Sequence, residues 1–135
     1  MHDVVVARLG ETYLIAAEAY LKMGKTEEAA QMINKLRQRP ETIRKGYTTE
    51  MTVTSNDINI DFILDERARE LAGEYVRWTD LKRTHTLVEY ATKYNEDGIK
   101  ESAMIGPDGK YKILRPIPQA AIDLNQAKVT QNPGY

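Results

Sequence analysis

Two amphipathic segments joined by a glycine constrain the fold of this chain more than any other feature. Residues 5–23 carry apolar side chains at helical spacing, and Gly24 follows where a left-handed helix cap is needed. Thr26 offers an N-cap for a second helix, which should end before Pro40 because proline disfavours helical geometry in the preceding residue. The apolar stripe of the first segment consists of Leu9, Tyr13, Ala16, Ala17, Tyr20 and Leu21. We predict a helical hairpin over residues 5–39, about the length of one tetratricopeptide repeat, which needs neighbours to bury both its faces.

A loop and two further helices are expected after this hairpin. Residues 40–56 lose the helical pattern and are rich in threonine, so we predict a loop with room for a short strand. Residues 57–94 regain the pattern. There we predict a third helix that runs through Tyr75 and a fourth that is capped by Thr79-Asp80 and runs to Ala91.

The last segment, residues 95–135, is expected to contain a β-hairpin and an extended tail. Gly106-Pro107-Asp108-Gly109 stands between two short apolar runs, which is typical of a hairpin turn. Prolines at positions 116, 118 and 133 favour extended backbone beyond it. A short helical turn is predicted over residues 119–125.

Composition excludes several classes of function. The chain has 135 residues, of which 41% are hydrophobic and 29% charged, as expected for one globular domain. Its formal net charge of -1 leaves no basic surplus for a nucleic-acid backbone, so no nucleic-acid partner is expected. No apolar run approaches the roughly 20 residues that cross a bilayer. Because there is no cysteine, none of these residues can form a disulfide, act as a thiolate nucleophile or carry a lipid anchor.

Three stretches, read together, resemble the C-terminal half of the SusD/RagB family. The first is RLGETYLIAAEA at residues 8–19 together with INKLR at 33–37. The second is ILDERAREL at 63–71 together with Glu74 and RWTDLKR at 77–83. The third is PIPQ at 116–119 together with DLN at 123–125 and QNPGY at 131–135. They match in order and spacing across nearly the whole chain. The positions that we take as the structural signature are Glu66, Arg67, Glu70, Arg77, Trp78, Asp80, Arg83, Asn132 and Pro133.

The resemblance implies a mostly helical fold, with hairpins similar to tetratricopeptide repeats, irregular loops, a small β-hairpin and an extended C-terminal tail. Members of the family are lipid-anchored proteins on the outer membrane of Bacteroidetes that cover a TonB-dependent transporter and pass oligosaccharides or other nutrients to it. They are several times longer than this chain, so we expect residues 1–135 to be a C-terminal part that serves mainly as scaffold. Gly73-Glu74-Tyr75 departs from the acid-then-glycine order usual in the family.

Three functions follow from the resemblance and from the residues. The first is a glycan- or nutrient-binding surface protein of a SusCD-type uptake system, held at the outer membrane only through a lipid anchor absent from these residues. The alternative is an interaction module, similar to tetratricopeptide repeats, that docks the transporter and has no glycan site of its own. A glycoside hydrolase ranks third. Because members of the family bind without hydrolysing, we expect no enzyme.

Three glutamates give the hydrolase hypothesis its only support. Glu66, Glu70 and Glu74 lie four residues apart on one face of the predicted third helix, with Asp80 nearby in sequence. A glycosidase needs two carboxylates that flank a sugar bond. Such a pair would have to lie in an open cleft.

We interpret these glutamates as structural, because arginines lie at ion-pairing distances along the same helix. Asp65 precedes Arg69 by four residues, and Arg67 precedes Glu70 by three. Arg77 and Arg83 supply further partners on the segment that follows. A partly buried set of such pairs fixes how helices and the closing tail dock.

A metal site is not expected. Residues 56–61 alternate oxygen-bearing side chains as a calcium loop does. Counting from residue 57, the sixth position is Phe62 instead of glycine and the twelfth is Ala68 instead of glutamate, which excludes an EF-hand. These side chains are predicted to cap a helix. The two histidines are far apart in sequence, and no cofactor is predicted.

The aromatic residues divide into core and surface candidates. Tyr13, Tyr20 and Tyr75 fall on apolar helical faces and are expected in the core. Trp78 is expected to pack between helices. Tyr47 and Tyr111 lie in the predicted loop and hairpin, so they are the candidates for contact with the apolar face of a sugar ring.

Overall fold

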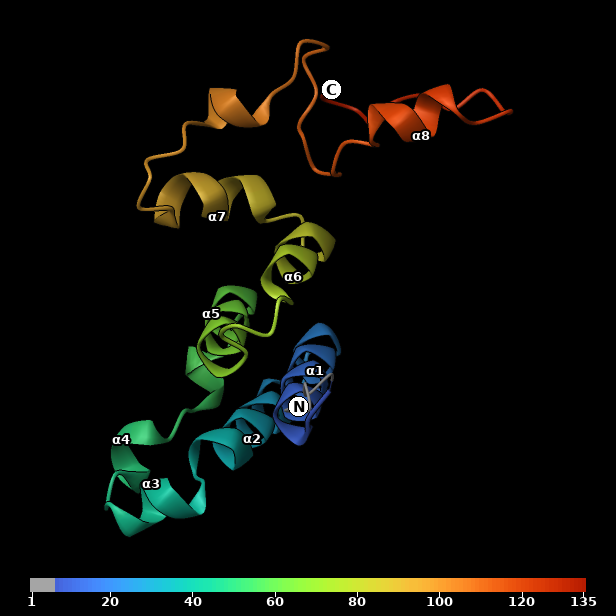
Figure 1. The fold of residues 1–135 in the computed structure, drawn as a ribbon. Helices are drawn as coiled ribbons and strands as arrows, with labels where there is room; N and C mark the ends of the chain where they lie inside the picture. The colour runs from blue at the N-terminus through green and yellow to red at the C-terminus, as the bar shows by residue number, and fades with distance from the viewer. Residues whose placement is uncertain (1–6) are drawn as a thin grey trace. The chain divides into compact units, whose positions relative to one another are not determined.

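The structure, a computed structural model, describes residues 7–135, and the chain divides between Arg77 and Trp78 into two compact units (Figure 1). The prediction of a mostly helical chain is confirmed. Residues 5 and 6 of the predicted hairpin lie outside the described residues. None of the helices in the described part of the chain is both long and apolar enough to span a membrane.

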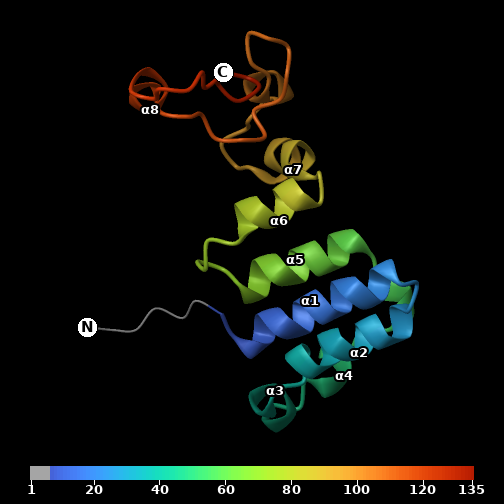
Figure 2. The same ribbon diagram turned by 90° about the vertical axis from the view of Figure 1, so that its right-hand side faces the viewer.

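The first unit begins with a helical hairpin. Helices α1 (Leu9–Lys22) and α2 (Thr26–Arg37) lie side by side, as Figure 2 shows. Gly24 adopts φ 73° between them, which is the left-handed geometry that the sequence predicts there. The backbone N–H of Lys25 returns to the carbonyl of Tyr20 at 2.9 Å, so the connection is tight and Thr26 is the first helical residue instead of the N-cap.

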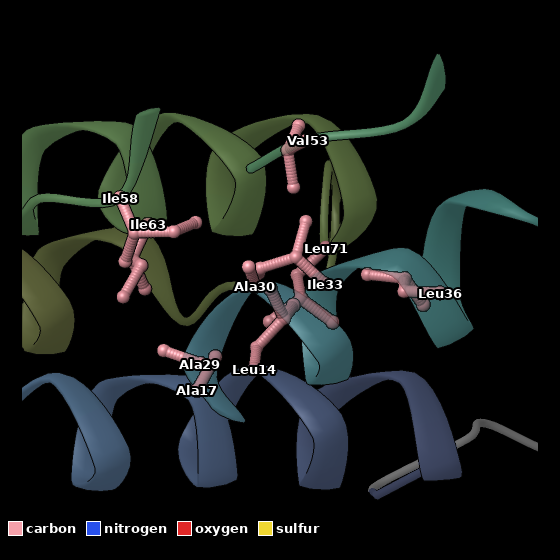
Figure 3. Packing of buried hydrophobic residues seen from close by; sticks show 10 residues of the cluster. All are labelled: Leu14, Ala17, Ala29, Ala30, Ile33, Leu36, Val53, Ile58, Ile63 and Leu71. Atoms are coloured by element: carbon pink, nitrogen blue, oxygen red, sulfur yellow. The ribbon is translucent and has the colours of Figure 1, made fainter. Parts of the chain in front are cut away.

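Helix α5 (Ile60–Glu70) completes the core of this unit. Leu14 of α1, Ile33 of α2 and Ile63 of α5 are fully buried members of one apolar cluster; in Figure 3, Leu14 and Ile33 lie together and Ile63 lies beside Ile58. The small residues Ala17 and Ala29 let the helices approach closely. The remaining members of the cluster are Ala30, Leu36, Val53, Ile58 and Leu71. Burial of these side chains is the main stabilising contribution to the unit.

Residues 40–56 differ from the predicted loop with a short strand. They form helices α3 (Pro40–Arg44) and α4 (Thr48–Met51), then the 3-10 turn η1 (Ser55–Asp57). Pro40 occupies the first turn of α3, where its missing N–H costs no hydrogen bond, so it ends one helix and starts the next. These helices are too short for an apolar periodicity to be recognisable in the sequence.

Asn34 ties this segment back to the hairpin. Its amide nitrogen donates to the carbonyl of Val53 at 2.8 Å, and its amide oxygen accepts from the Val53 N–H at 2.9 Å. Both backbone groups of Val53 are thereby satisfied, and its side chain is 6% exposed. Asn59 then caps α5 by accepting from the N–H of Phe62 at 2.8 Å, as the capping prediction for residues 56–61 requires.

The second unit opens with helices α6 (Arg77–Arg83), which begins at the division between the units, and α7 (Leu87–Tyr94). The prediction of a single fourth helix that runs to Ala91 is wrong, because the helix is interrupted between α6 and α7. The hydroxyl of Thr84 donates to the carbonyl of Asp80 at 2.8 Å, and His85 adopts φ 61°. Threonine hydroxyls compete for helix carbonyls, which favours an end at this point.

The hairpin and tail follow η2 (Glu101–Met104). The predicted turn is present, with one isolated antiparallel bridge between Ile105 and Tyr111 instead of a longer ladder. A short helix, α8 (Gln119–Asp123), lies where a helical turn was predicted. The backbone of Gly134 then returns to the hairpin. A Cβ added to Gly106 would lie 2.0 Å from the carbonyl oxygen of Gly134. Only glycine permits this approach.

Candidate functional site

Glu66 is the buried centre of one group of charges in the first unit. Arg37 donates to its carboxylate from Nε at 3.0 Å and from Nη2 at 2.6 Å, and Arg69 donates from Nη2 at 2.7 Å. Burial raises the pKa of Glu66, but the hydrogen bonds and charges of Arg37 and Arg69 together outweigh it and hold the pKa below its ordinary value. The carboxylate is therefore ionised at neutral pH and joins α2 to α5.

Glu70 is the centre of a second group. Its carboxylate accepts from Arg8, just before α1, and from Arg39, just before α3. The Nε of Arg8 also donates to Glu74 at 2.8 Å. The hydrogen bonds to Glu74 and Glu70 raise the pKa of Arg8. A Cβ on Gly10 would lie 2.9 Å from the Glu70 carboxylate, so this glycine of α1 leaves room for the pair.

These partners differ from the predicted ones. Arg69 pairs with Glu66, which Arg37 of α2 also binds, and not with Asp65. Glu70 pairs with Arg8 and Arg39 across the fold and not with Arg67. Arg67 is 4% exposed and approaches Glu11 of α1 at 3.7 Å. Among its contacts, Arg77 donates to the carbonyl of Leu64 at 2.8 Å.

Neither glutamate is arranged as a catalytic acid. A general acid at neutral pH needs a raised pKa, whereas the pKa of Glu66 is lowered. Glu70 is bound by two guanidinium groups. The described residues include no cluster of three or more histidine, cysteine or acidic side chains that could hold a metal ion.

Tyr47, a candidate from the sequence, lies beside an open hollow of ≈ 340 Å³ over the bend between α3 and α4. Its side chain is 56% exposed, and Met51 contributes a second apolar surface. Glu50 and Lys45 supply polar groups at the same hollow. An aromatic ring beside a few polar groups suits a small polar ligand with one apolar face, such as a sugar ring.

Two further hollows adjoin that one. A hollow of ≈ 400 Å³ shares Thr42 and Met51 with it and reaches Arg39 and Glu70. A third, of ≈ 360 Å³, shares Arg39 and Glu70 with the second and extends to Tyr13 of α1. All three lie within the first unit. The three hollows share lining residues from Tyr13 past Arg39 to Tyr47, and we refer to them together as the arginine groove.

Tyr111, the other sequence candidate, is held on the hairpin of the second unit. Its hydroxyl donates to the carboxylate of Glu101, and this hydrogen bond together with the negative charge of Glu101 raises the pKa of Tyr111. The ring is 41% exposed and forms the bridge with Ile105. It lies in the other unit from Tyr47.

The signature residues of the second unit hold its helices and tail. Asp80 is 3% exposed and accepts from Arg83 at 3.0 Å. Trp78 is half-buried, with the Arg115 guanidinium 5.6 Å from its ring centre. The amide of Asn132, next to Pro133, donates to the carbonyl of Arg115 at 2.7 Å and so brings the tail to the same arginine.

Sequence reasoning missed Arg8, Arg37 and Arg39, and misplaced Tyr75. The three arginines pair with residues about thirty or more positions away, which helical spacing does not reveal. Tyr75 is not in the core: it is 96% exposed and adopts φ 62° in the turn after α5. That turn follows Leu71 and includes Gly73 at φ 81°.

Comparison with known proteins identifies the family. The sequence model of the SusD family matches residues 2–135, so the chain belongs to the SusD family. The starch-binding protein SusD of Bacteroides thetaiotaomicron is 33% identical over 135 residues, which is 98% of this chain and 22% of that protein. Two proteins of Formosa agariphila are also similar. SusD-like protein P38 is 32% identical over 108 residues, 78% of this chain and 21% of that protein.

The second of these, SusD-like protein P2, is 30% identical over 137 residues, 98% of this chain and 26% of that protein. The chain therefore spans about a quarter or less of the length of these curated relatives. No solved structure shows a significant match.

Proposed function

We propose that this chain is the C-terminal part of a glycan- or nutrient-binding surface protein that serves a SusCD-type uptake system, and that it acts mainly as scaffold. The family match over residues 2–135 carries this proposal. The named activity of one relative, starch binding, makes an oligosaccharide the expected ligand. The partner would be a TonB-dependent transporter, and the longer protein would be a lipoprotein at the outer membrane.

The arrangement of the signature residues supports a scaffold role. Glu66 and Glu70 each have an arginine partner from another segment of the fold, whereas Asp80 pairs with Arg83 within α6. Because all three carboxylates are occupied by arginines, the arrangement argues against hydrolysis. Binding without catalysis is therefore the proposed activity of the longer protein.

A glycan array tests the proposal with two samples, this chain and the longer protein that contains it. We expect the longer protein to retain one class of oligosaccharide strongly and the chain alone to retain it at least about tenfold less, because scaffold residues supply few direct contacts. Circular dichroism must first show that the chain is helical. If the longer protein retains no glycan in any class, the proposed function is wrong.

Tyr47 and Tyr111 remain the proposed aromatic contacts of this part. Tyr47 is the stronger candidate because it borders a hollow, whereas the hydroxyl of Tyr111 is bound to Glu101. Replacing Tyr47 by alanine in the longer protein should weaken glycan retention several-fold if it stacks on a sugar. Tyr94→Ala is a matched control, since both rings are 56% exposed.

A second candidate function rests on the outer face of α1. Leu9 and Ile15 of α1 and its C-cap residue Met23 are 64%, 55% and 62% exposed, and exposed apolar side chains of this size occur at protein interfaces. This favours the interaction module that docks the transporter. Ile15→Glu should then abolish binding of the longer protein to its purified transporter and leave glycan binding intact. Unchanged binding to the transporter would remove the support that this face provides.

A further inference from the structure

The arginine groove carries more positive than negative charge. The cationic side chains that line its three hollows are Arg8, Lys35, Arg37, Arg39, Lys45 and Arg69. The carboxylates that line them are fewer, namely Glu41 and Glu50 at the Tyr47 hollow and Glu66 and Glu70 further along. The formal net charge of the whole chain is -1, so this positive excess is local to the groove. A concave surface of this kind attracts anions.

Two of these arginines can bind a ligand without leaving their present partners. The side chains of Arg39 and Arg69 are 51% and 57% exposed, although each donates to a glutamate. Arg69 uses Nε and Nη2 for Glu66, and Arg39 uses Nε and Nη2 for Leu36 and Glu70. Because a guanidinium group has five N–H donors, each retains its Nη1 group for an anion.

The existing ion pairs also orient these donors. Each exposed arginine is fixed by two hydrogen bonds, so little side-chain freedom remains to be lost when an anion binds. Guanidinium groups suit the planar carboxylate and the oxygen-rich sulfate or phosphate group. The centre of the groove is therefore suited to a carboxylate or sulfate.

The ends of the groove are aromatic. Tyr13 lines the hollow at one end, where the ammonium group of Lys35 lies 5.9 Å from its ring centre. Tyr47 lines the hollow at the other end. Aromatic faces at both ends of a cationic centre fit a chain of sugar rings that carries acid groups better than they fit a purely acidic peptide.

We propose that the arginine groove is a subsite for an acidic oligosaccharide, whose carboxylate or sulfate groups are bound by Arg39 and Arg69 and whose sugar faces lie against Tyr13 and Tyr47. This proposal rests on the proposed function and specifies a ligand class for this part of the protein. A neutral glucan would leave the donors of the two arginines without an anionic partner. The subsite therefore discriminates by charge.

Trigalacturonic acid and the neutral maltotriose are the probes, titrated into the 135-residue chain by NMR. We expect the acid to bind more tightly, to lose affinity as salt is added, and to shift the backbone signals of residues 36–42 and 66–70. Arg39→Gln combined with Arg69→Gln should weaken binding by about tenfold or more, from the loss of charge-assisted hydrogen bonds. This variant should fold, because Glu66 keeps Arg37 and Glu70 keeps Arg8.

Arg44→Gln is the matched control. Arg44 is an exposed arginine of the same unit that also pairs with a glutamate, Glu41, but it does not line the groove. Its removal should leave the affinity for trigalacturonic acid unchanged. If both variants weaken binding equally, the effect is one of total charge and the subsite proposal is wrong.

Four other results would overturn the proposal. Equal affinity for maltotriose would show that the arginine groove does not distinguish an acidic sugar from a neutral one. NMR shifts confined to residues 78–135 would place the site in the other unit. This measurement uses the unmutated chain and does not depend on the folding of a variant. Binding of hexaglutamate as tight as that of the acid sugar, with the same loss in the double variant, would make the groove a peptide site. Failure of trigalacturonic acid to bind would also overturn the subsite proposal. The proposed function is tested separately, by the glycan array of the longer protein.

Discussion

The two units of the chain reach their folds by different means. Among the described residues, the first unit contains all the fully buried large side chains, Leu14, Ile33, Ile63 and Leu64, and its helices are joined by buried ion pairs. The second unit buries only Leu81, Leu87 and Tyr90 among its apolar residues, and side-chain hydrogen bonds of Gln131 and Asn132 together with close glycine contacts hold its tail. Substitutions should accordingly have large, global effects in the first unit and local effects in the second.

The largest effect is expected from Ile33→Ala. Ile33 is fully buried between α1, α2 and α5, so the substitution leaves a cavity and should lower the free energy of unfolding by about 3 kcal/mol. Thermal unfolding by circular dichroism measures this as a fall in melting temperature of about 10 °C. Ile43→Ala, at a position that is 58% exposed, should change the melting temperature little. An equal loss in the two variants would contradict the described core.

A loss of similar or slightly smaller size is expected from Glu66→Ala. The change leaves Arg37 and Arg69 without their shared carboxylate in a partly buried position and should cost about 3 kcal/mol. Chemical denaturation of the two proteins provides the measurement. Glu41→Ala breaks an exposed pair with Arg44 and serves as control, with little change in stability expected.

The pH dependence of this effect has a definite sign. Because the pKa of Glu66 is lowered in the folded state, its ion pairs contribute fully above the ordinary value of 4.5 and are lost as pH falls through the lowered pKa. The stability difference between the wild-type chain and Glu66→Gln should therefore be constant at neutral pH and shrink below pH 4.5. A difference that grew on acidification would mean that Glu66 is protonated in the folded state.

A moderate effect is expected from Asn34→Ala. The substitution leaves the backbone N–H and carbonyl of the buried Val53 without their partner and should cost about 1–3 kcal/mol. Asn34→Asp can still accept from the N–H but cannot donate to the carbonyl, so an intermediate loss is expected. Amide exchange at Val53 should rise in both variants. Slow exchange there in the alanine variant would show that another group binds Val53.

The smallest global effect is expected from Gly106→Ala, which sharpens the contrast between the units. Its Cβ would meet the carbonyl of Gly134 at 2.0 Å, so residues 131–135 should leave the hairpin. NMR should show changed signals in the tail and unchanged signals for residues 7–77. Gly109→Ala strains a φ of 72° but meets nothing within 4 Å, and should keep the tail in place. Changed signals throughout the first unit would contradict the local role of this contact.

Local rules predicted the parts of the fold that local forces decide. The hairpin of α1 and α2 follows from apolar spacing and Gly24, and the cap of α5 follows from its asparagine, because both depend on residues within a few positions. The break between α6 and α7 was missed because the apolar pattern continues through it. The hydroxyls of Thr84 and Thr86 donate hydrogen bonds to carbonyls of α6, which the pattern does not reveal. Residues 40–56 were missed because their helices are only one turn long.

The candidate site was only partly predictable for a related reason. Tyr47 was found because it is aromatic in a polar segment, and the structure places it at a hollow. The arginine groove depends on Arg8, Arg37 and Arg39, which reach glutamates of α5 across the fold. Charge patterns within one helix suggested Asp65 as the partner of Arg69, whereas packing against α2 selects Glu66. Pairs between distant segments require the tertiary structure.

The most direct test of the proposed function is isothermal titration of the best glycan from the array into this chain and into the longer protein that contains it. We expect the longer protein to bind at least about tenfold more tightly, since residues outside this scaffold would supply most contacts, and to bind without releasing reducing sugar. Equal affinity in the two samples would show that the principal binding site lies within these 135 residues and that the chain is not mainly scaffold.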